Sequence, residues 1–190
     1  MLLPVYCMAQ DYAAMIEEHR KKYISHFLED EKSPVKSDDV KYIKFFPASE
    51  VYNITCTFTA SDDTSTFDMM TYSGKKKKYS RYGHVDFQMD TLPLRLYLYE
   101  SESLKNTAEY AGYLFLPFKD PTNGVESYGG GRYLDLQKSD IIDNKVTIDF
   151  NKAYNPYCAY SEGYSCPIPP SENHLPVKVE AGEMNFQKDH

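Results

Sequence analysis

The sequence predicts a mainly β protein in which an antiparallel meander forms a barrel or a sandwich, with one N-terminal α-helix and a long loop rich in Pro, Tyr and Cys near the C-terminus. Three observations lead to this prediction. Amphipathic helical spacing occurs near the start of the chain, short β-rich runs separated by turn residues follow residue 41, and no long helical pattern interrupts those runs. Parallel strands need long crossover connections, so an antiparallel arrangement is favoured.

The composition is that of one globular domain. The 190 residues are 42% hydrophobic and 26% charged, with a net charge of −7. A chain of this length can bury a core of its own. A negative net charge gives the protein no overall attraction for nucleic-acid phosphates or anionic lipid. No apolar run is long enough to cross a bilayer. We therefore expect no nucleic-acid partner and no membrane span, whereas the oligomeric state does not follow from these features.

Residues 1–9 resemble the end of a secretory signal peptide, because the apolar run LLPVYCMA stops just before the polar Gln10. Signal peptides begin with positive charge, and no Lys or Arg precedes Arg20. The alternative is an apolar arm packed on the domain. We expect a periplasmic or secreted protein whose single domain spans residues 10–190, with a cytoplasmic protein as the alternative.

A helix is predicted over residues 11–29, where Tyr12, Ile16, Tyr23 and Phe27 recur at helical spacing among charged residues. Asp11 is a candidate N-cap, and the segment DEKSPVKSDD supplies residues that end a helix. We expect this helix to cover one face or one end of a β-domain that spans residues 41–187.

The β-domain contains eight candidate strands, at residues 51–60, 66–72, 77–88, 94–100, 113–117, 131–136, 146–150 and 177–186. The last two are separated by a loop far longer than ordinary connections. Such loops are usually functional or disordered, and the aromatic content of this one argues against disorder. Any chemistry is therefore expected in residues 149–176. The glycines at 129–131 lack the spacing of a nucleotide-binding loop and favour a tight backbone approach or a bulge.

Five blocks of sequence carry a resemblance to a known family. They are FKDPTNG at 118–124, SYGGGRYLDL at 127–136, DFNKAYNPYCAY at 149–160, CPIPPSEN at 166–173 and AGE at 181–183. With these blocks the chain resembles the bacterial and archaeal proteins called domain of unknown function 1684 (DUF1684). The resemblance implies a single domain often found in secreted bacterial proteins. It implies no activity, so the functional case depends on the residues themselves.

Polar residues flank or interrupt the apolar strand ends, so we expect several of them to converge at one mouth of the barrel. Arg132 is suited to hold a carboxylate or a phosphate, and neighbouring amides to hold neutral polar groups. The alternative is structural, with an ion pair from Arg132 to Asp149 or Glu183 that pins the loop. The candidate ligand-binding residues are Arg132, Asp149, Asn151, Asn155, Asn173 and Glu183.

Cys158 and Cys166 allow four interpretations. A disulfide would close a short loop and add about 2 to 3 kcal/mol of stability. A reactive thiol at Cys166 would use His174 or Glu172 as the proton carrier. A zinc site with His174 is a third interpretation, although the gaps are wider than those of structural zinc sites. Inert buried thiols are the fourth, and overall we expect no metal ion and no cofactor.

The leading hypothesis is a domain that binds a small polar or anionic ligand, as yet unknown, at the end closed by residues 149–176. The first alternative is an enzyme with the catalytic residues Cys166, His174 and Glu172 in the same cleft. The second is an envelope interaction module that uses the Tyr-rich loop 154–164, since tyrosine is favoured at interfaces. The Gly-x-Ser-x-Gly, HExxH and EF-hand motifs do not occur, which removes several common hydrolase and metal-binding classes.

Overall fold

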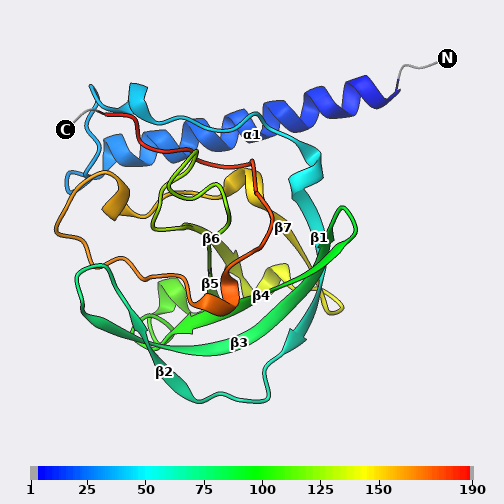
Figure 1. The fold of residues 1–190 in the computed structure, drawn as a ribbon, viewed down its shortest axis with the longest axis vertical. Coiled ribbons are helices and arrows are strands. Elements are labelled where there is room, and N and C mark those ends of the chain that lie inside the picture. The colour runs from blue at the N-terminus through cyan, green and yellow to red at the C-terminus, as the bar shows by residue number, and fades with distance from the viewer. Residues whose placement is uncertain (1–3, 189–190) are drawn as a thin grey trace.

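The computed structural model describes residues 4–188, and the side chains of residues 11–188 (Figure 1). Its helix and strands are α1 (Pro4–Glu29), β1 (Asn53–Ala60), β2 (Thr66–Met70), β3 (Lys76–Met89), β4 (Leu92–Ser101), β5 (Tyr113–Phe118), β6 (Arg132–Gln137) and β7 (Lys145–Asp149). Short 3-10 helices lie between them: η1 (Val40–Tyr42), η2 (Glu50–Tyr52), η3 (Ala108–Tyr110), η4 (Lys138–Asp140), η5 (Phe150–Lys152), η6 (Tyr157–Ala159) and η7 (Ser171–Asn173).

The described strands form one antiparallel sheet of seven, in the order β6-β5-β4-β3-β1-β7, and β2 pairs with β3. The sheet curls into a half-barrel, with β6 and β7 at the two ends of the strand order (Figure 1). The predicted mainly β, antiparallel fold with one N-terminal helix is confirmed. No helix of the described chain combines the length and the hydropathy that a bilayer span requires.

The predicted strand at residues 177–186 is wrong. Burial there resembles that of a strand, since Val179 and Ala181 are buried. The backbone, however, bonds to side chains and loops instead of a neighbouring strand: Val179 N donates to Asp120, and Glu183 N donates to the carbonyl of Ala153. A single β-bridge joins Glu183 to Phe45. The segment therefore fills the interior of the half-barrel as extended coil.

Helix α1 begins at Pro4, earlier than predicted, so Asp11 lies inside the helix and the prediction of an N-cap there is wrong. Proline is well suited to the first position of a helix, because its fixed φ matches the helical backbone. Its missing N–H is no loss there, since an N–H at that position has no partner within the helix. The predicted signal-peptide remnant, residues 1–9, lies partly outside the described residues, and its removal stays a prediction.

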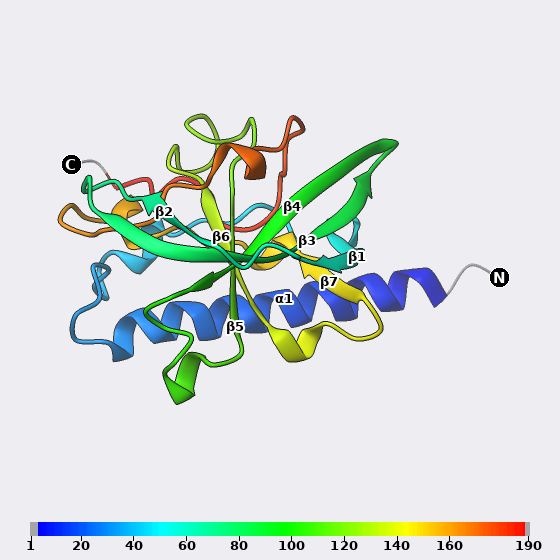
Figure 2. The ribbon, with the colours of Figure 1, turned by 90° about the horizontal axis from the view of Figure 1, so that it is seen from below.

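One stripe of α1 packs on the domain, as its spacing predicted. Tyr12, Ile16 and Phe27 are buried, and the Arg20 guanidinium donates to the backbone carbonyl of Phe46 at 2.8 Å. Figure 2 shows the helix running along one side of the half-barrel, near β7. The helix thereby covers the side where the sheet does not close.

The sheet has an apolar core on its concave face and an aromatic cluster on the other face. Leu96, Leu114 and Ile148 belong to the core, which Val179 and Ala181 of the C-terminal segment complete. The second cluster consists of Met69, Tyr79, Tyr99, Phe115 and Tyr133. A β-bulge between Arg81 and Gly83 shifts the register of β3 against β4. Such a bulge changes the face that the following residues present, so one long strand contributes to both clusters.

Candidate functional site

A groove of about 880 Å³ lies between α1, β6 and β7. It lies where the half-barrel stays open, because the edges of β6 and β7 are bridged there by a helix instead of by another strand. Its floor is apolar, with Leu134, Leu136 and Ile148. Polar side chains around this floor include His19, Tyr23, Asp135, Asp149, Lys152 and Tyr154.

Helix α1 presents one row of side chains to the groove. Met15, His19, Tyr23 and His26 follow one another at intervals of three or four residues, so they share one helix face. Burial lowers the pKa of His19, and the nearby Lys152 lowers it further. The imidazole of His19 is therefore neutral at neutral pH and can donate or accept a hydrogen bond.

Asp135 lies on β6 between two leucines of the core. Its Oδ1 atom accepts hydrogen bonds from the hydroxyls of Tyr113, at 2.7 Å, and Tyr154, at 2.8 Å. The residue is exposed toward the groove, and the neighbouring protein atoms desolvate its carboxylate only in part. Burial raises the pKa of Asp135, and the two tyrosine hydroxyls counteract part of this effect.

Asp149 fixes the other side of the groove to the helix. Its Oδ1 atom accepts from the Tyr12 hydroxyl at 2.8 Å and from the backbone N–H of Asn151 at 3.1 Å. Its Oδ2 atom lies 3.5 Å from Lys152 Nζ. Burial and the hydrogen bond to Asp149 raise the pKa of Tyr12. Of the six predicted ligand-binding residues, Asp149 is the one that lines the groove.

Arg132 lies in the interior, with no exposed surface. Its Nη2 atom donates to Asp120 Oδ1 at 2.9 Å and to the Val179 carbonyl at 2.8 Å, and Nη1 donates to the Ala181 carbonyl. The alternative of an ion pair from Arg132 to Asp149 or Glu183 is therefore wrong in its partner, since the carboxylate that pairs with Arg132 is Asp120. Sequence spacing could not identify this partner, because the turn that brings Asp120 to Arg132 is set by residues 119–131. The guanidinium holds the C-terminal segment in place.

Asn173 inserts into the sheet between β4 and β5. These strands share one register pair, Tyr99 with Phe115, and separate beyond it. In the gap, the Asn173 amide accepts from the backbone N–H of Tyr97 at 2.8 Å and donates to the carbonyls of Tyr97, at 2.9 Å, and Pro117, at 2.7 Å. The side chain thus replaces the missing strand hydrogen bonds, which is a structural role.

Asn151 and Asn155 are also buried. Asn151 exchanges hydrogen bonds with both backbone groups of Ser49, at 2.8 and 2.9 Å. Asn155 donates from its backbone to Glu183 at 2.9 Å and from its side chain to the Met184 carbonyl at 2.8 Å. Both residues therefore connect the loop after β7 to distant backbone segments.

Glu183 is fully buried and accepts hydrogen bonds from Tyr23, at 2.9 Å, and Tyr160, at 2.7 Å. Burial raises the pKa of Glu183 to about 7, although Asn155 and the two tyrosines counteract it. Burial and the nearby Glu183 raise the pKa of both tyrosines as well. The cluster joins α1, the loop after β7 and the C-terminal segment.

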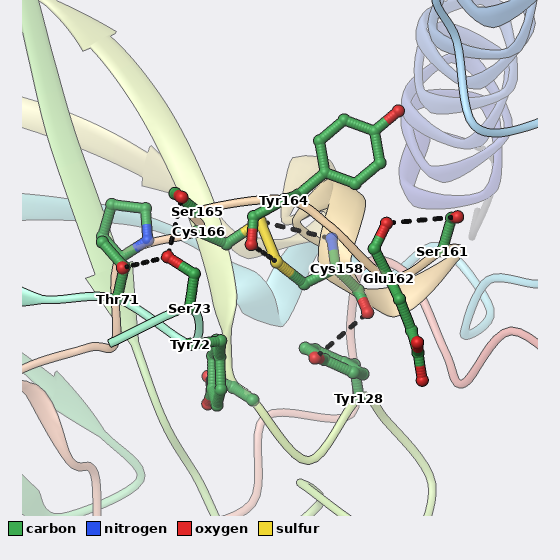
Figure 3. Close-up of a disulfide and its surroundings, with 12 residues drawn as sticks. Thr71, Tyr72, Ser73, Tyr128, Cys158, Ser161, Glu162, Tyr164, Ser165 and Cys166 are labelled. Carbon is green, nitrogen blue, oxygen red and sulfur yellow. Dashed lines mark hydrogen bonds between the residues drawn. A yellow bond between two sulfur atoms is a disulfide. The ribbon is translucent and has the colours of Figure 1, made fainter. Parts of the chain in front are cut away.

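Cys158 and Cys166 form a disulfide, which Figure 3 shows beside the carbonyl of Tyr164. The Tyr128 hydroxyl donates to the Cys158 carbonyl at 3.3 Å, and the hydroxyls of Ser73 and Ser165 lie 2.7 Å apart (Figure 3). The loop is thus attached to the β2–β3 hairpin. Cys56 is buried, and its burial raises its thiol pKa to about 12.

The other two predicted catalytic residues do not contact a sulfur atom. Glu172 accepts a pair of hydrogen bonds from Arg81, at 2.8 and 2.9 Å, and another from the Tyr99 hydroxyl at 2.6 Å. His174 Nε2 lies 3.1 Å from the carbonyl of Pro169. Within the described residues no group of three or more His, Cys, Asp or Glu side chains is arranged to hold a metal ion.

Sequence reasoning did not single out most groove residues. Asp135 lay within a predicted strand and a block of family resemblance, and His19 and His26 lay within the predicted helix, but none of the three was named as a candidate. The available signal was the row of Met15, His19, Tyr23 and His26, which places aromatic and titratable groups on one helix face. That row does not say which strands it faces, so the groove could not be assembled from sequence.

Three comparisons relate this chain to known proteins. The model of a family described as "Protein of unknown function (DUF1684)" matches residues 38–184. The solution structure of an uncharacterized protein from Haloarcula marismortui is similar, with 30% sequence identity and a TM-score of 0.71 over 95% of this chain and 97% of that one. No curated protein shows significant similarity. The family match covers most of the chain, and the chain therefore belongs to the DUF1684 family.

Proposed function

We propose that this protein is a periplasmic or secreted domain that binds a small polar ligand in the groove between α1, β6 and β7. The groove itself carries the proposal. Its volume of about 880 Å³ lies in the range of pockets that hold small molecules. Such pockets combine apolar walls with a few convergent polar groups, and the groove has both.

This proposal moves the binding site away from Arg132. A ligand clamp needs accessible guanidinium atoms, whereas Arg132 is buried against Asp120. The groove offers Asp135, Asp149 and the neutral His19 to a ligand instead. The polar ligand of the original hypothesis is retained, and its anionic character has no support in the groove.

Three probes with the same apolar part test the proposal: 2-phenylethylamine, 2-phenylethanol and 3-phenylpropionate, each titrated into isotope-labelled protein and followed by backbone amide shifts. At least one probe should shift amides of β6, β7 and the facing side of α1. Thr147, an exposed residue that lines the groove, is replaced by Trp to fill it. The control is Thr59→Trp on β1, at an exposed position outside the groove.

Binding in the groove predicts that Thr147→Trp abolishes these shifts and that Thr59→Trp preserves them. The proposal fails if no probe shifts groove amides at millimolar concentration. It also fails if the shifts persist unchanged in the filled variant, because the probes would then bind elsewhere.

The two alternative functions receive less support. An enzyme that uses Cys166 requires a free thiol, and that sulfur is held in the disulfide with Cys158. An interaction module that uses the loop 154–164 requires exposed tyrosines. Tyr160 is buried, and Tyr154 and Tyr164 are half-buried.

A further inference from the structure

Asp135 is a groove carboxylate with no charged partner. None of the ion pairs among the side chains of residues 11–188 includes it. Both of its hydrogen bonds, from Tyr113 and Tyr154, end on the same oxygen atom, Oδ1. The two phenols hold the carboxylate in a fixed orientation, and Oδ2 stays available to a group that enters the groove.

Aromatic rings continue from this carboxylate along the groove. The ring of Tyr154 lies 6.1 Å from that of Tyr23, which lies 5.0 Å from Phe27. Phe27 in turn lies 5.9 Å from Tyr157. All four residues line the groove. The faces of aromatic rings attract cations, and ammonium groups in particular.

The charged side chains that line the groove are negative on balance. It contains the carboxylates of Asp135, Asp140 and Asp149 and a single lysine, Lys152. Lys152 lies 3.5 Å from Asp149, and burial keeps His19 neutral at neutral pH. The protein as a whole carries a net charge of −7. A negative field of this kind attracts cations to the groove and repels anions.

Asp135 is an exposed residue of the groove, and a ligand that covers its carboxylate removes water from it, which is costly unless the ligand compensates. Partial burial already raises the pKa of Asp135. A bound cation would restore a charged partner to Asp135. The apolar floor of Leu134, Leu136 and Ile148 would take the uncharged part of the same molecule.

From this geometry we infer that the ligand is a small organic cation, an ammonium ion joined to an apolar group, with Asp135 as its counter-ion and the tyrosine rings around the charge. The inference rests on the proposed function and names the chemical class of the ligand. It assigns Asp135 a direct contact with the ligand, and Tyr113 and Tyr154 the role of orienting that carboxylate.

The same three probes test the class of ligand, because they differ mainly in charge. The cationic 2-phenylethylamine should bind at least about tenfold more tightly than 2-phenylethanol, and 3-phenylpropionate most weakly. Asp135→Asn should remove the preference for the amine and leave the affinity for the alcohol unchanged. The Asn side chain keeps an oxygen that can accept from both tyrosines, so the fold is retained.

Asp62→Asn is the matched control, because it makes the same change of net charge at an exposed position outside the groove. It should leave the preference for the amine intact. If the alcohol or the carboxylate binds as tightly as the amine, and Thr147→Trp abolishes that binding, the cation assignment is overturned while the groove remains a binding site. If Asp135→Asn keeps the full preference for the amine, Asp135 is not the counter-ion. If none of the probes shifts groove amides, the proposed function and the cation assignment fail together.

Discussion

The hydroxyl of Tyr23 on α1 donates a hydrogen bond of 2.9 Å to Glu183, a residue of the C-terminal segment that is fully buried. Tyr23 also lines the groove, so one side chain connects the candidate binding site to the interior. Glu183 is the most buried carboxylate that α1 contacts, and burial raises its pKa from 4.5 to about 7. The attachment of the helix therefore involves a group that titrates near neutral pH.

Replacing Glu183 with Gln should flatten the dependence of stability on pH. A carboxyl group whose pKa is raised by folding binds its proton more tightly in the folded state. Its contribution is therefore fully present below pH 4.5 and is lost as the pH rises to about 7. The shift corresponds to about 3 kcal/mol of unfolding free energy. Urea unfolding of wild type and Glu183→Gln between pH 5 and pH 8 measures the difference.

The exposed Glu180 supplies the control, since Glu180→Gln removes a carboxylate three residues away without altering a buried group. Its pH profile should follow the wild type. Parallel profiles for wild type and Glu183→Gln would show that the buried carboxyl group does not titrate differently in the folded state.

Arg132→Ala should destabilise the domain strongly. The Arg132–Asp120 pair has no exposed surface, so the substitution leaves the Asp120 charge buried without its partner. Breaking such a pair typically costs about 3–5 kcal/mol. Arg95 forms an ion pair with Asp86 at the surface through two hydrogen bonds, and Arg95→Ala should cost less than about 1 kcal/mol. Chemical denaturation of both variants compares them, and equal losses would contradict a special role of the buried pair.

The fold could be predicted from the sequence where a segment with a strand or helix pattern also has the packing partner that such an element needs. The β-rich runs between turn residues predicted β1, β3, β4 and β7, and helical spacing predicted the buried stripe of α1. The β-rich run at residues 177–186 misled, because its buried residues Val179 and Ala181 pack in the core without an adjacent strand. A sequence pattern reports which side of a backbone is buried, and the partner of the backbone hydrogen bonds is a separate, non-local property.

The candidate site was less predictable for the same reason. Arg132, Asn173 and Glu183 were singled out as polar residues in apolar surroundings, and all three are buried. The same polarity serves a ligand or an internal hydrogen bond, and only the fold distinguishes the two. Asp135 was overlooked because its tyrosine partners, Tyr113 and Tyr154, come from segments on either side of β6 in the sequence.

Gly131→Ala should lower the stability of the domain by about 2 kcal/mol or more. Gly131 has a φ of 92°, and an added Cβ atom would lie 2.7 Å from the Phe118 carbonyl oxygen. The backbone must therefore move where β6 begins. Gly129 has room for a Cβ atom, whose nearest neighbour would lie 3.5 Å away, so Gly129→Ala should change stability by less than about 0.5 kcal/mol. Thermal unfolding of both variants tests this, and an unchanged midpoint for Gly131→Ala would contradict the expected clash.

Removing the disulfide should lower the free energy of unfolding by about 2.5 kcal/mol, because the unfolded chain regains the freedom of a short loop. Cys158 and Cys166 are eight positions apart, and replacing both with Ser leaves the buried Cys56 in place. Urea unfolding with and without reductant provides the measurement. Reductant should lower the wild type to the level of the double variant and leave that variant unchanged. Alkylation of the unfolded, unreduced wild type should spare both cysteines. If instead it labels them, and reductant has no effect, the loop is held without the covalent bond.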